Sequence, residues 1–392
     1  MKKRIKILAD LNFKSFINLF TPFADIEFIE GRLIERKYLA GANALLVRSV
    51  TEVNKELIDG SELKFIGTAT SGVEHVDQKA LAEAGILFSN AKGANADSVC
   101  DYVIAALVAL DKNGKNFAEK FLKRTYGIIG AGEVGRRLIN RLVQCGVQSV
   151  LIYDPPLQNR HNTEAEVLAF ATLDEVLSCD VVSVHVPLEH SGNYPTTELL
   201  NAEQIKKLKP GAILINASRG GILDETAMLE RLKSEVDFER HERLLTVLDV
   251  WEAEPFVRKA LVAAVDLATP HIAGYSAQAK RNAMRILLGK LTDTFDIENE
   301  LSDSVPSRPL ILSEILPQKM LISPASIVGT LYPLIELSEQ MKFQALRDEG
   351  LGFDAQRGKL RLRNEFQSYV VDKSIKLNEP DRKLLRGLSF QN

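Results

Sequence analysis

The 392-residue chain lacks the features of an exported, membrane-bound or nucleic-acid-binding protein. Its three cysteines, Cys100, Cys145 and Cys179, are too few for a disulfide framework and form no C-x-x-C motif. No run of about 18 apolar residues suggests a membrane span, and no export signal follows the basic start Met1-Lys2-Lys3-Arg4. Its 49 basic and 52 acidic residues nearly balance, so nothing favours a nucleic acid or an anionic membrane surface. We therefore expect a cytoplasmic protein with neither nucleic acid nor membrane as a partner.

A glycine-rich turn follows a short apolar stretch at 126–129 and has the spacing G-x-G-x-x-G. Such glycines allow a tight turn, close approach of a pyrophosphate and close packing of the next helix. That helix should bury one face, made of Val134, Leu138, Ile139, Leu142 and Val143. A carboxylate nineteen residues past the last glycine would accept hydrogen bonds from ribose hydroxyls and favours NAD over NADP. We predict an NAD site at Gly130, Gly132, Glu133, Val134, Gly135 and Asp154.

Apolar strands alternate with charged helical segments along the first 300 residues. Strands are predicted at 5–9, 44–47, 64–68 and 86–89, and six more at 126–129, 149–153, 181–185, 212–216, 244–249 and 267–269. This alternation is typical of parallel sheets covered by helices on both faces. Long helices at 95–110 and 277–297 precede and follow the second set of strands, which suggests an insertion.

The predicted architecture is α/β with three domains. A flavodoxin-like substrate domain takes residues 1–99 and 270–300, and a doubly wound (Rossmann) NAD-binding domain takes residues 100–269. Five of the 14 prolines lie between residues 306 and 333, which indicates a linker or arm. Residues 301–392 are predicted to form a small α+β domain.

Three residues suited to dehydrogenase chemistry follow three consecutive strands. Arg219 has a planar fork that can hold a carboxylate. His271 is the natural proton carrier, because an imidazole exchanges protons near neutral pH. Glu254, bonded to one ring nitrogen, would fix the tautomer and stabilise the imidazolium. Each residue alone could be structural, but their shared position at strand ends favours an active site. No histidine lies at metal-ligand spacing, so we expect no metal.

Four ordered motifs resemble the D-isomer-specific 2-hydroxyacid dehydrogenases over about residues 1–300: the glycine turn, Asn216-Ala217-Ser218-Arg219-Gly220, Asp249 to Pro255, and Pro270 to Gly274. The resemblance implies NAD-dependent oxidation of a 2-hydroxy acid, with Arg219, Glu254 and His271 catalytic. It implies further cofactor contacts at Val186, where the family commonly has threonine, and at Ala217, Arg219, Asp249 and Gly274. It implies substrate contacts at Arg48, Ser49, Thr70, Ser71, Gly72 and Tyr275.

Within the family, the segments at 47–51 and 67–77 and the last 90 or so residues resemble members that act on a small phosphorylated 2-hydroxy acid and form homodimers. Three alternatives stay open. The substrate could be that of a sister enzyme, such as 3-phosphoglycerate or hydroxypyruvate. The protein could be an NAD-sensing scaffold similar to corepressors of this family. The C-terminal domain could regulate rather than dimerise.

Overall fold

The computed structural model describes residues 4–111, 116–160, 169–298, 309–317, 321–347, 353, 356–357 and 362–391. The chain divides into two compact units, one of Met1–Asn95 with Ala277–Pro306 and one of Ala96–Ser276 with Ser307–Asn392. The first unit is therefore discontinuous, and a long helix starts at each of the first two crossings between the units. The predicted boundary at 300/301 lies outside the described residues.

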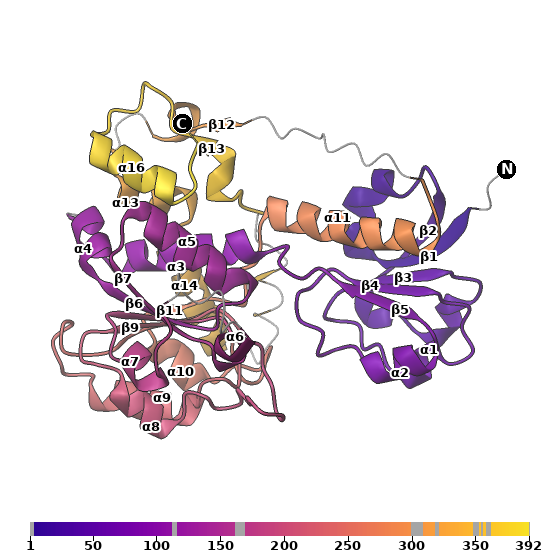
Figure 1. Ribbon diagram of the computed structural model, residues 1–392, viewed down its shortest axis with the longest axis horizontal. Helices are drawn as coiled ribbons and strands as arrows, with labels where there is room; N and C mark the ends of the chain where they lie inside the picture. The colour runs from indigo at the N-terminus through magenta and orange to yellow at the C-terminus, as the bar shows by residue number, and fades with distance from the viewer. Residues whose placement is uncertain are drawn as a thin grey trace. The chain divides into compact units, whose positions relative to one another are not determined.

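The first unit contains a five-stranded parallel sheet in the order β2-β1-β3-β4-β5 (Figure 1). This is the flavodoxin-like strand order, as predicted. β2 is not among the predicted strands, because it is an edge strand whose exposed acidic residues Asp25 and Glu27 interrupt the apolar pattern. The strands are β1 (Ile5–Asp10), β2 (Ala24–Ile29), β3 (Ala44–Val47), β4 (Phe65–Thr68) and β5 (Leu87–Asn90). The helices are η1 (Leu11–Leu19), η2 (Gly31–Leu33), η3 (Arg36–Leu39), α1 (Lys55–Ile58), α2 (Gln78–Glu83) and α11 (Ala277–Thr294).

Consecutive residues of a strand point to opposite sides of the sheet, and the central strands β3 and β4 are buried on both sides. Leu46 of β3 joins an apolar cluster with Leu287 and Leu291 of α11, whereas its neighbour Leu45 joins the cluster under α1 and α2. The central strands β3 and β4 are therefore buried along their whole length, and their carboxyl ends carry polar loops.

The second unit contains a six-stranded parallel sheet in the order β11-β10-β9-β8-β6-β7. Phe170 adds an isolated parallel bridge to Ile152 beyond β7, which completes a doubly wound order. All six predicted strands are present: β6 (Thr125–Ile129), β7 (Ser149–Tyr153), β8 (Val181–Val184), β9 (Ile213–Asn216), β10 (Leu245–Leu248) and β11 (Leu267–Ala268). The helices are α3 (Ala96–Leu110), α4 (Phe117–Lys123), α5 (Glu133–Cys145), α6 (Pro155–Arg160), α7 (Leu173–Leu177), α8 (Ala202–Lys207), α9 (Glu225–Ser234) and α10 (Lys259–Ala264).

Helix α5 buries the predicted face except for one residue. Leu138, Ile139 and Leu142 are buried as expected, but Val143 is 58% exposed. Val143 lies five residues after Leu138, which is about 140° around a helix with 3.6 residues per turn. Cys145, which the prediction did not include, is buried on the same side as Leu138 and lies against Gly387 of the C-terminal segment.

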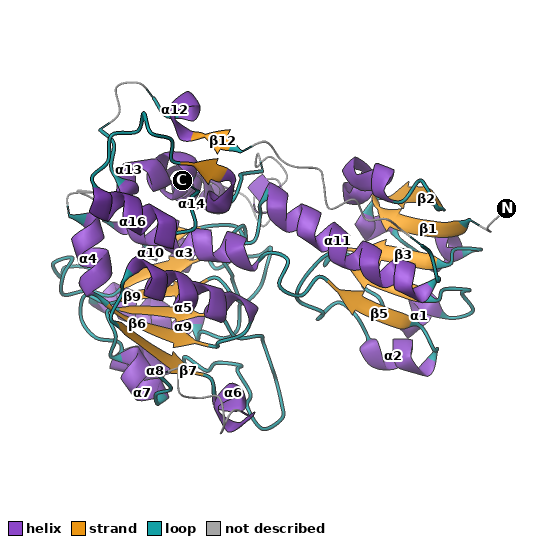
Figure 2. Cartoon of the chain, turned by 45° about the horizontal axis from the view of Figure 1, so that its top comes forward, coloured by secondary structure: helices purple, strands orange, loops and turns teal. Residues whose placement is uncertain are grey.

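The C-terminal segment, Ser307–Asn392, packs on the second unit (Figures 1 and 2). α16 contacts α5, α13 contacts α3 and α4, and α14 contacts α10 and β11. Among the described residues, no helix has the length and apolar character needed to cross a membrane. The elements of this segment are β12 (Leu310–Ile311), α12 (Leu312–Ile315), α13 (Pro324–Leu331), α14 (Leu334–Arg347), η5 (Phe366–Ser368), β13 (Tyr369–Val370) and α16 (Glu379–Gly387).

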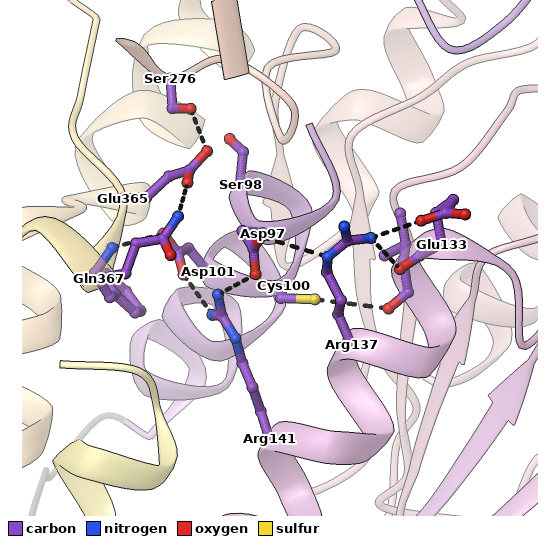
Figure 3. Close-up of polar contacts among 12 residues, drawn as sticks. Asp97, Ser98, Cys100, Asp101, Glu133, Arg137, Arg141, Ser276, Glu365 and Gln367 are labelled. Carbon is purple, nitrogen blue, oxygen red and sulfur yellow. Dashed lines mark hydrogen bonds and ion pairs between the residues drawn. The ribbon is translucent and has the colours of Figure 1, made fainter. Parts of the chain in front are cut away.

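Buried ion pairs join this segment to the start of α3. Asp101, which is fully buried, accepts hydrogen bonds from Arg141 of α5 at 2.5 Å and from Arg363 at 3.1 Å. Arg141 also pairs with Asp97 at 2.9 Å, and Figure 3 shows these side chains converging between the helices. A buried charge is tolerated only with such partners, so the C-terminal segment is held in a defined position on α3 and α5.

Candidate active site

The glycine turn links β6 to α5 and has the shape that a pyrophosphate requires. Gly130 has φ +90°, which strains any other L residue. A Cβ on Gly135 would lie 2.0 Å from the Gly130 carbonyl oxygen, so α5 can approach the turn only with glycine there. A Cβ on Gly132 would meet no protein atom within 4 Å. The turn therefore leaves open space at the amino end of α5, where backbone N–H groups attract anions.

Asp154, at the end of β7, is tied to this turn. Its Oδ2 accepts the N–H of Ala131 and its Oδ1 that of Leu157, each at 2.8 Å. A carboxylate has about four acceptor sites, so two remain for ribose hydroxyls. Val186 lies against the turn, since a Cβ on Gly130 would meet its Cγ1 at 2.7 Å. These residues fit a dinucleotide with an unphosphorylated adenosine ribose.

Arg219 lies in a tight loop after β9. Asn216 shapes this loop: its Oδ1 accepts the N–H and Oγ–H of Ser218 at 3.1 and 2.8 Å, and its Nδ2 donates to the Arg219 carbonyl at 3.0 Å. A Cβ on Gly220 would lie 1.9 Å from the carbonyl oxygen of Trp251, after β10. Glycine at this position thus lets the arginine loop lie directly against the loop that leads to the glutamate.

His271 and Glu254 form the pair on which the predicted chemistry depends. His271 Nδ1 lies 2.8 Å from Glu254 Oε2, and the two side chains are 35% and 23% exposed. Glu254 Oε1 accepts the N–H of Trp251 at 3.0 Å, which orients the carboxylate. A carboxylate only accepts hydrogen bonds, so Nδ1 carries the proton and the neutral ring has its lone pair on Nε2. His271 has φ +54°, an uncommon conformation for a residue with a side chain and a frequent one at functional sites.

Asp249 holds the backbone that carries the histidine. Its carboxylate accepts the N–H groups of Ile272 and Ala273 at 2.8 and 2.9 Å and the hydroxyl of Thr269 at 2.6 Å. Its carbonyl accepts the N–H of His271 at 2.7 Å. The side chain is completely buried, and this burial raises its pKa above the ordinary aspartate value. Both carboxylate oxygens thus fix the loop at the end of β11.

The predicted substrate contacts Arg48, Ser49, Thr70, Ser71 and Gly72 belong to the first unit, whereas Arg219, Glu254, His271 and Tyr275 belong to the second. The former follow the carboxyl ends of β3 and β4.

Thr70 is held by a small hydrogen-bond network that the local sequence pattern does not predict. Its hydroxyl donates to the Gly72 carbonyl at 2.7 Å and lies 2.9 Å from the hydroxyl of Thr68. Thr68 is also bonded to Nε2 of buried His75 at 2.9 Å. The motif at 75–77 was noted only as a resemblance, because nothing in the local pattern reveals a contact across seven residues.

Three other titratable side chains, those of His185, Cys100 and Cys145, are unsuited to proton transfer near neutral pH. Burial lowers the pKa of His185 to about 3, and its Nε2 bonds the Ser183 hydroxyl at 2.9 Å, so the ring stays neutral. Burial raises the pKa of the Cys100 and Cys145 thiols to about 12, which leaves them unreactive. Among the described residues, no three histidine, cysteine, aspartate or glutamate side chains are grouped as a metal site would need.

The doubly wound sheet, the glycine turn and the bonded histidine and glutamate at neighbouring strand ends define a dinucleotide-dependent dehydrogenase. Comparison with known proteins agrees: residues 107–273 match the family described as D-isomer specific 2-hydroxyacid dehydrogenase, NAD binding domain. The erythronate-4-phosphate dehydrogenase of a Marinomonas species is 43% identical over 276 residues, 70% of this chain and 69% of that protein. The enzyme of the same name from Escherichia fergusonii is 44% identical over 278 residues, 70% of each chain.

The chain therefore belongs to the D-isomer specific 2-hydroxyacid dehydrogenase family, and its cofactor is NAD, as predicted. Solved structures show the same fold. An NAD-bound 3-phosphoglycerate dehydrogenase from Entamoeba histolytica superposes with a TM-score of 0.60 at 23% identity, over 75% of this chain and 96% of that one. A D-lactate dehydrogenase from Aquifex aeolicus gives 0.57 at 21%, over 74% and 95%. About a quarter of this chain lies outside each structural match.

Proposed function

We propose that the protein oxidises the C2 hydroxyl of 4-phospho-D-erythronate, giving 2-oxo-3-hydroxy-4-phosphobutanoate and NADH. The printed name of its relatives at 43–44% identity supports this substrate. The observation that carries the chemistry is the 2.8 Å contact between His271 Nδ1 and Glu254 Oε2, which leaves Nε2 as a proton acceptor. In this proposal the reaction serves pyridoxal 5′-phosphate (vitamin B6) biosynthesis in the cytoplasm.

The proposed roles follow from the side-chain chemistry. Arg219 binds the substrate carboxylate with its fork of N–H groups and polarises the adjacent C2 centre. His271 Nε2 accepts the proton of the C2 hydroxyl, and Glu254 stabilises the imidazolium that forms. NAD, when bound at the glycine turn, supplies the hydride acceptor. Gly130, Gly132, Glu133, Val134, Gly135, Asp154, Val186, Ala217, Asp249 and Gly274 are proposed to hold it.

Ser49, Thr70, Ser71, Gly72 and Tyr275, with Arg48, are proposed to bind the polyol and its phosphate. Hydroxyl and backbone groups suit the hydroxylated chain, and an arginine suits a phosphate. The sister specificities and the scaffold function are the outcomes against which this proposal is tested.

Initial rates of NADH formation with 4-phospho-D-erythronate, D-erythronate and 3-phospho-D-glycerate test the proposal directly. The same preparation is assayed in the reverse direction with hydroxypyruvate and NADH. We expect kcat/KM for 4-phospho-D-erythronate to exceed that for every other acid. A higher value for 3-phosphoglycerate or hydroxypyruvate would assign a sister specificity. NAD binding without turnover of any acid would indicate a scaffold.

We also propose that the protein is a homodimer that associates through the C-terminal segment. Large apolar side chains are exposed there, including Leu321 at 87% and Ile335 at 51%. Analytical ultracentrifugation of Leu321→Asp and Ile335→Asp should show monomers. Val236→Asp is the control, because Val236 is 73% exposed but lies outside this segment. Variants that all stay dimeric, or a monomeric wild type, would contradict the proposal and leave regulation as the role of the segment.

A further inference from the structure

An arginine of the C-terminal segment lies on the loop that follows the histidine. Arg357 Nη2 donates a hydrogen bond to the hydroxyl of Tyr275 at 3.2 Å. Its guanidinium carbon lies 5.4 Å from the centre of the Tyr275 ring and 5.8 Å from that of Phe353. Because Tyr275 is four residues after His271, a cation is thereby placed on the catalytic loop by a part of the chain more than 80 residues away.

Hydrogen bonds join the C-terminal segment to the residues on either side of Tyr275. Arg363, whose side chain is 10% exposed, donates through Nη2 to the Ala273 carbonyl at 3.3 Å and to the Ser98 hydroxyl at 2.7 Å. Ser276 Oγ donates to Glu365 Oε1 at 2.6 Å, the bond that Figure 3 shows. These bonds hold residues 363–365 against residues 273–276 from both sides. The residues before and after Tyr275 are therefore bonded to the same C-terminal segment that carries Arg357.

The substrate proposed above has a negative group at each end, a carboxylate on C1 and a phosphate on C4. Arg219 is assigned to the carboxylate and Arg48 is proposed for the phosphate, which carries up to two negative charges and can therefore bind a second cation. A guanidinium next to a phenol hydroxyl offers several N–H donors and an O–H donor, which is the chemistry that binds a phosphate oxygen fork.

We propose that Arg357, together with Tyr275, binds the phosphate of the substrate and sets the preference for a phosphorylated acid. This inference rests on the proposed function, because it assigns a residue to the substrate named there. It gives the C-terminal segment a part in substrate recognition, in addition to any part in association between subunits. Arg357 contacts the phosphate, which is remote from the reacting C2 atom, so its effect should appear in binding more than in turnover.

The test compares kcat/KM for 4-phospho-D-erythronate with that for D-erythronate, which lacks only the phosphate. We expect Arg357→Ala to lower the ratio of the two values by about 10- to 100-fold, as lost hydrogen bonds to a charged group would. Arg357→Lys keeps the charge without the fork and should lower it less. Tyr275→Phe keeps the ring without the hydroxyl and should lower the ratio by about threefold to tenfold.

A purely structural role for Arg357 gives a different result. If the side chain only packs on Phe353 and Tyr275, its loss lowers kcat/KM for both acids equally and leaves the ratio unchanged, which would overturn the proposal. Arg386→Ala is the matched control, since Arg386 is a half-exposed arginine of the same segment. Arg48→Ala is assayed in parallel. Loss of the phosphate preference in that variant alone would also overturn the proposal.

Failure of the proposed function is recognised separately. If the wild type does not oxidise 4-phospho-D-erythronate, the substrate assignment falls, and inorganic phosphate is then titrated calorimetrically into the NAD complex of each variant. Weaker phosphate binding by Arg357→Ala and Arg357→Lys, with Arg386→Ala unchanged, would still support a phosphate site. Equal binding by all variants would overturn it. Where Arg357→Ala does not fold, the lysine and phenylalanine variants decide.

Discussion

Two glycines of the turn, only three residues apart, should respond in opposite ways to the same added methyl group. At Gly132 a Cβ meets no protein atom within 4 Å, whereas at Gly135 it would lie 2.0 Å from the Gly130 carbonyl oxygen. Real Cβ atoms essentially never come closer than 3.0 Å to such an atom. We therefore predict that Gly132→Ala impairs NAD binding with little effect on stability, and that Gly135→Ala destabilises the fold itself.

The magnitudes follow from the local geometry. Gly132 is the N-cap of α5 with φ −74°, so alanine fits its backbone. Reduced freedom of the unfolded chain should add about 0.4–1 kcal/mol, and loss of a favourable N-cap should remove about 0.5–1 kcal/mol. These nearly cancel. A methyl group in the space of the pyrophosphate should cost about 1–3 kcal/mol of binding, or about 5- to 150-fold in Kd.

At Gly135 the neighbouring backbone must open by about 1 Å, which should lower the free energy of unfolding by about 1–3 kcal/mol. Urea unfolding without cofactor measures the stabilities, and isothermal titration calorimetry measures the NAD affinities. Gly289→Ala is the control, because Gly289 lies within α11 and a Cβ there would meet no atom within 4 Å. This substitution should raise the free energy of unfolding by up to about 1 kcal/mol. Wild-type NAD affinity in Gly132→Ala, or wild-type stability in Gly135→Ala, would refute the account of the turn.

Further predictions concern the site and its surroundings. His271→Ala should lower kcat by about 10²- to 10⁴-fold without changing the Kd for NAD, and unchanged turnover would count against its role as the base. Glu254→Gln should shift the acid limb of the pH–rate profile to lower pH, and an unchanged profile would count against its pairing with the histidine. Gly220→Ala forces the arginine loop away from Trp251, so kcat/KM should fall by about 10²-fold, and normal kinetics would exclude a need for that contact.

Because burial lowers the pKa of His185 to about 3, the unfolded chain binds a proton there below about pH 6.5 while the folded one does not. The free energy of unfolding should therefore fall with decreasing pH in this window, by about 2 kcal/mol more in the wild type than in His185→Asn between pH 7 and 5, and equal slopes in urea titrations would contradict it.

The local pattern of apolar residues predicted most strands of the two large sheets, because most of these strands are apolar runs. The spacing of its glycines predicted the turn at 130–135. Where the pattern was weak the prediction failed: exposed acids in β2 concealed an edge strand, and Val143 was placed on the wrong side of α5. In the first case the strand needs apolar residues on only part of its surface. In the second case, Val143 was counted with the buried face although it lies about 140° around the helix from Leu138.

The sequence alone was enough to predict ten of the eleven strands of the two large parallel sheets, the glycine turn, the family, and the residue types at the strand ends. These features are local, because each is set by residues close together in the sequence. The strand ends come together at one edge of the sheet because the strands are parallel. Packing of distant segments set the close approach at Gly220 and the burial of Asp101 between Arg141 and Arg363. It also brought the predicted partners His271 and Glu254 to within 2.8 Å. The same holds for Arg357 beside Tyr275, because contacts between residues tens of positions apart depend on packing that no local pattern encodes.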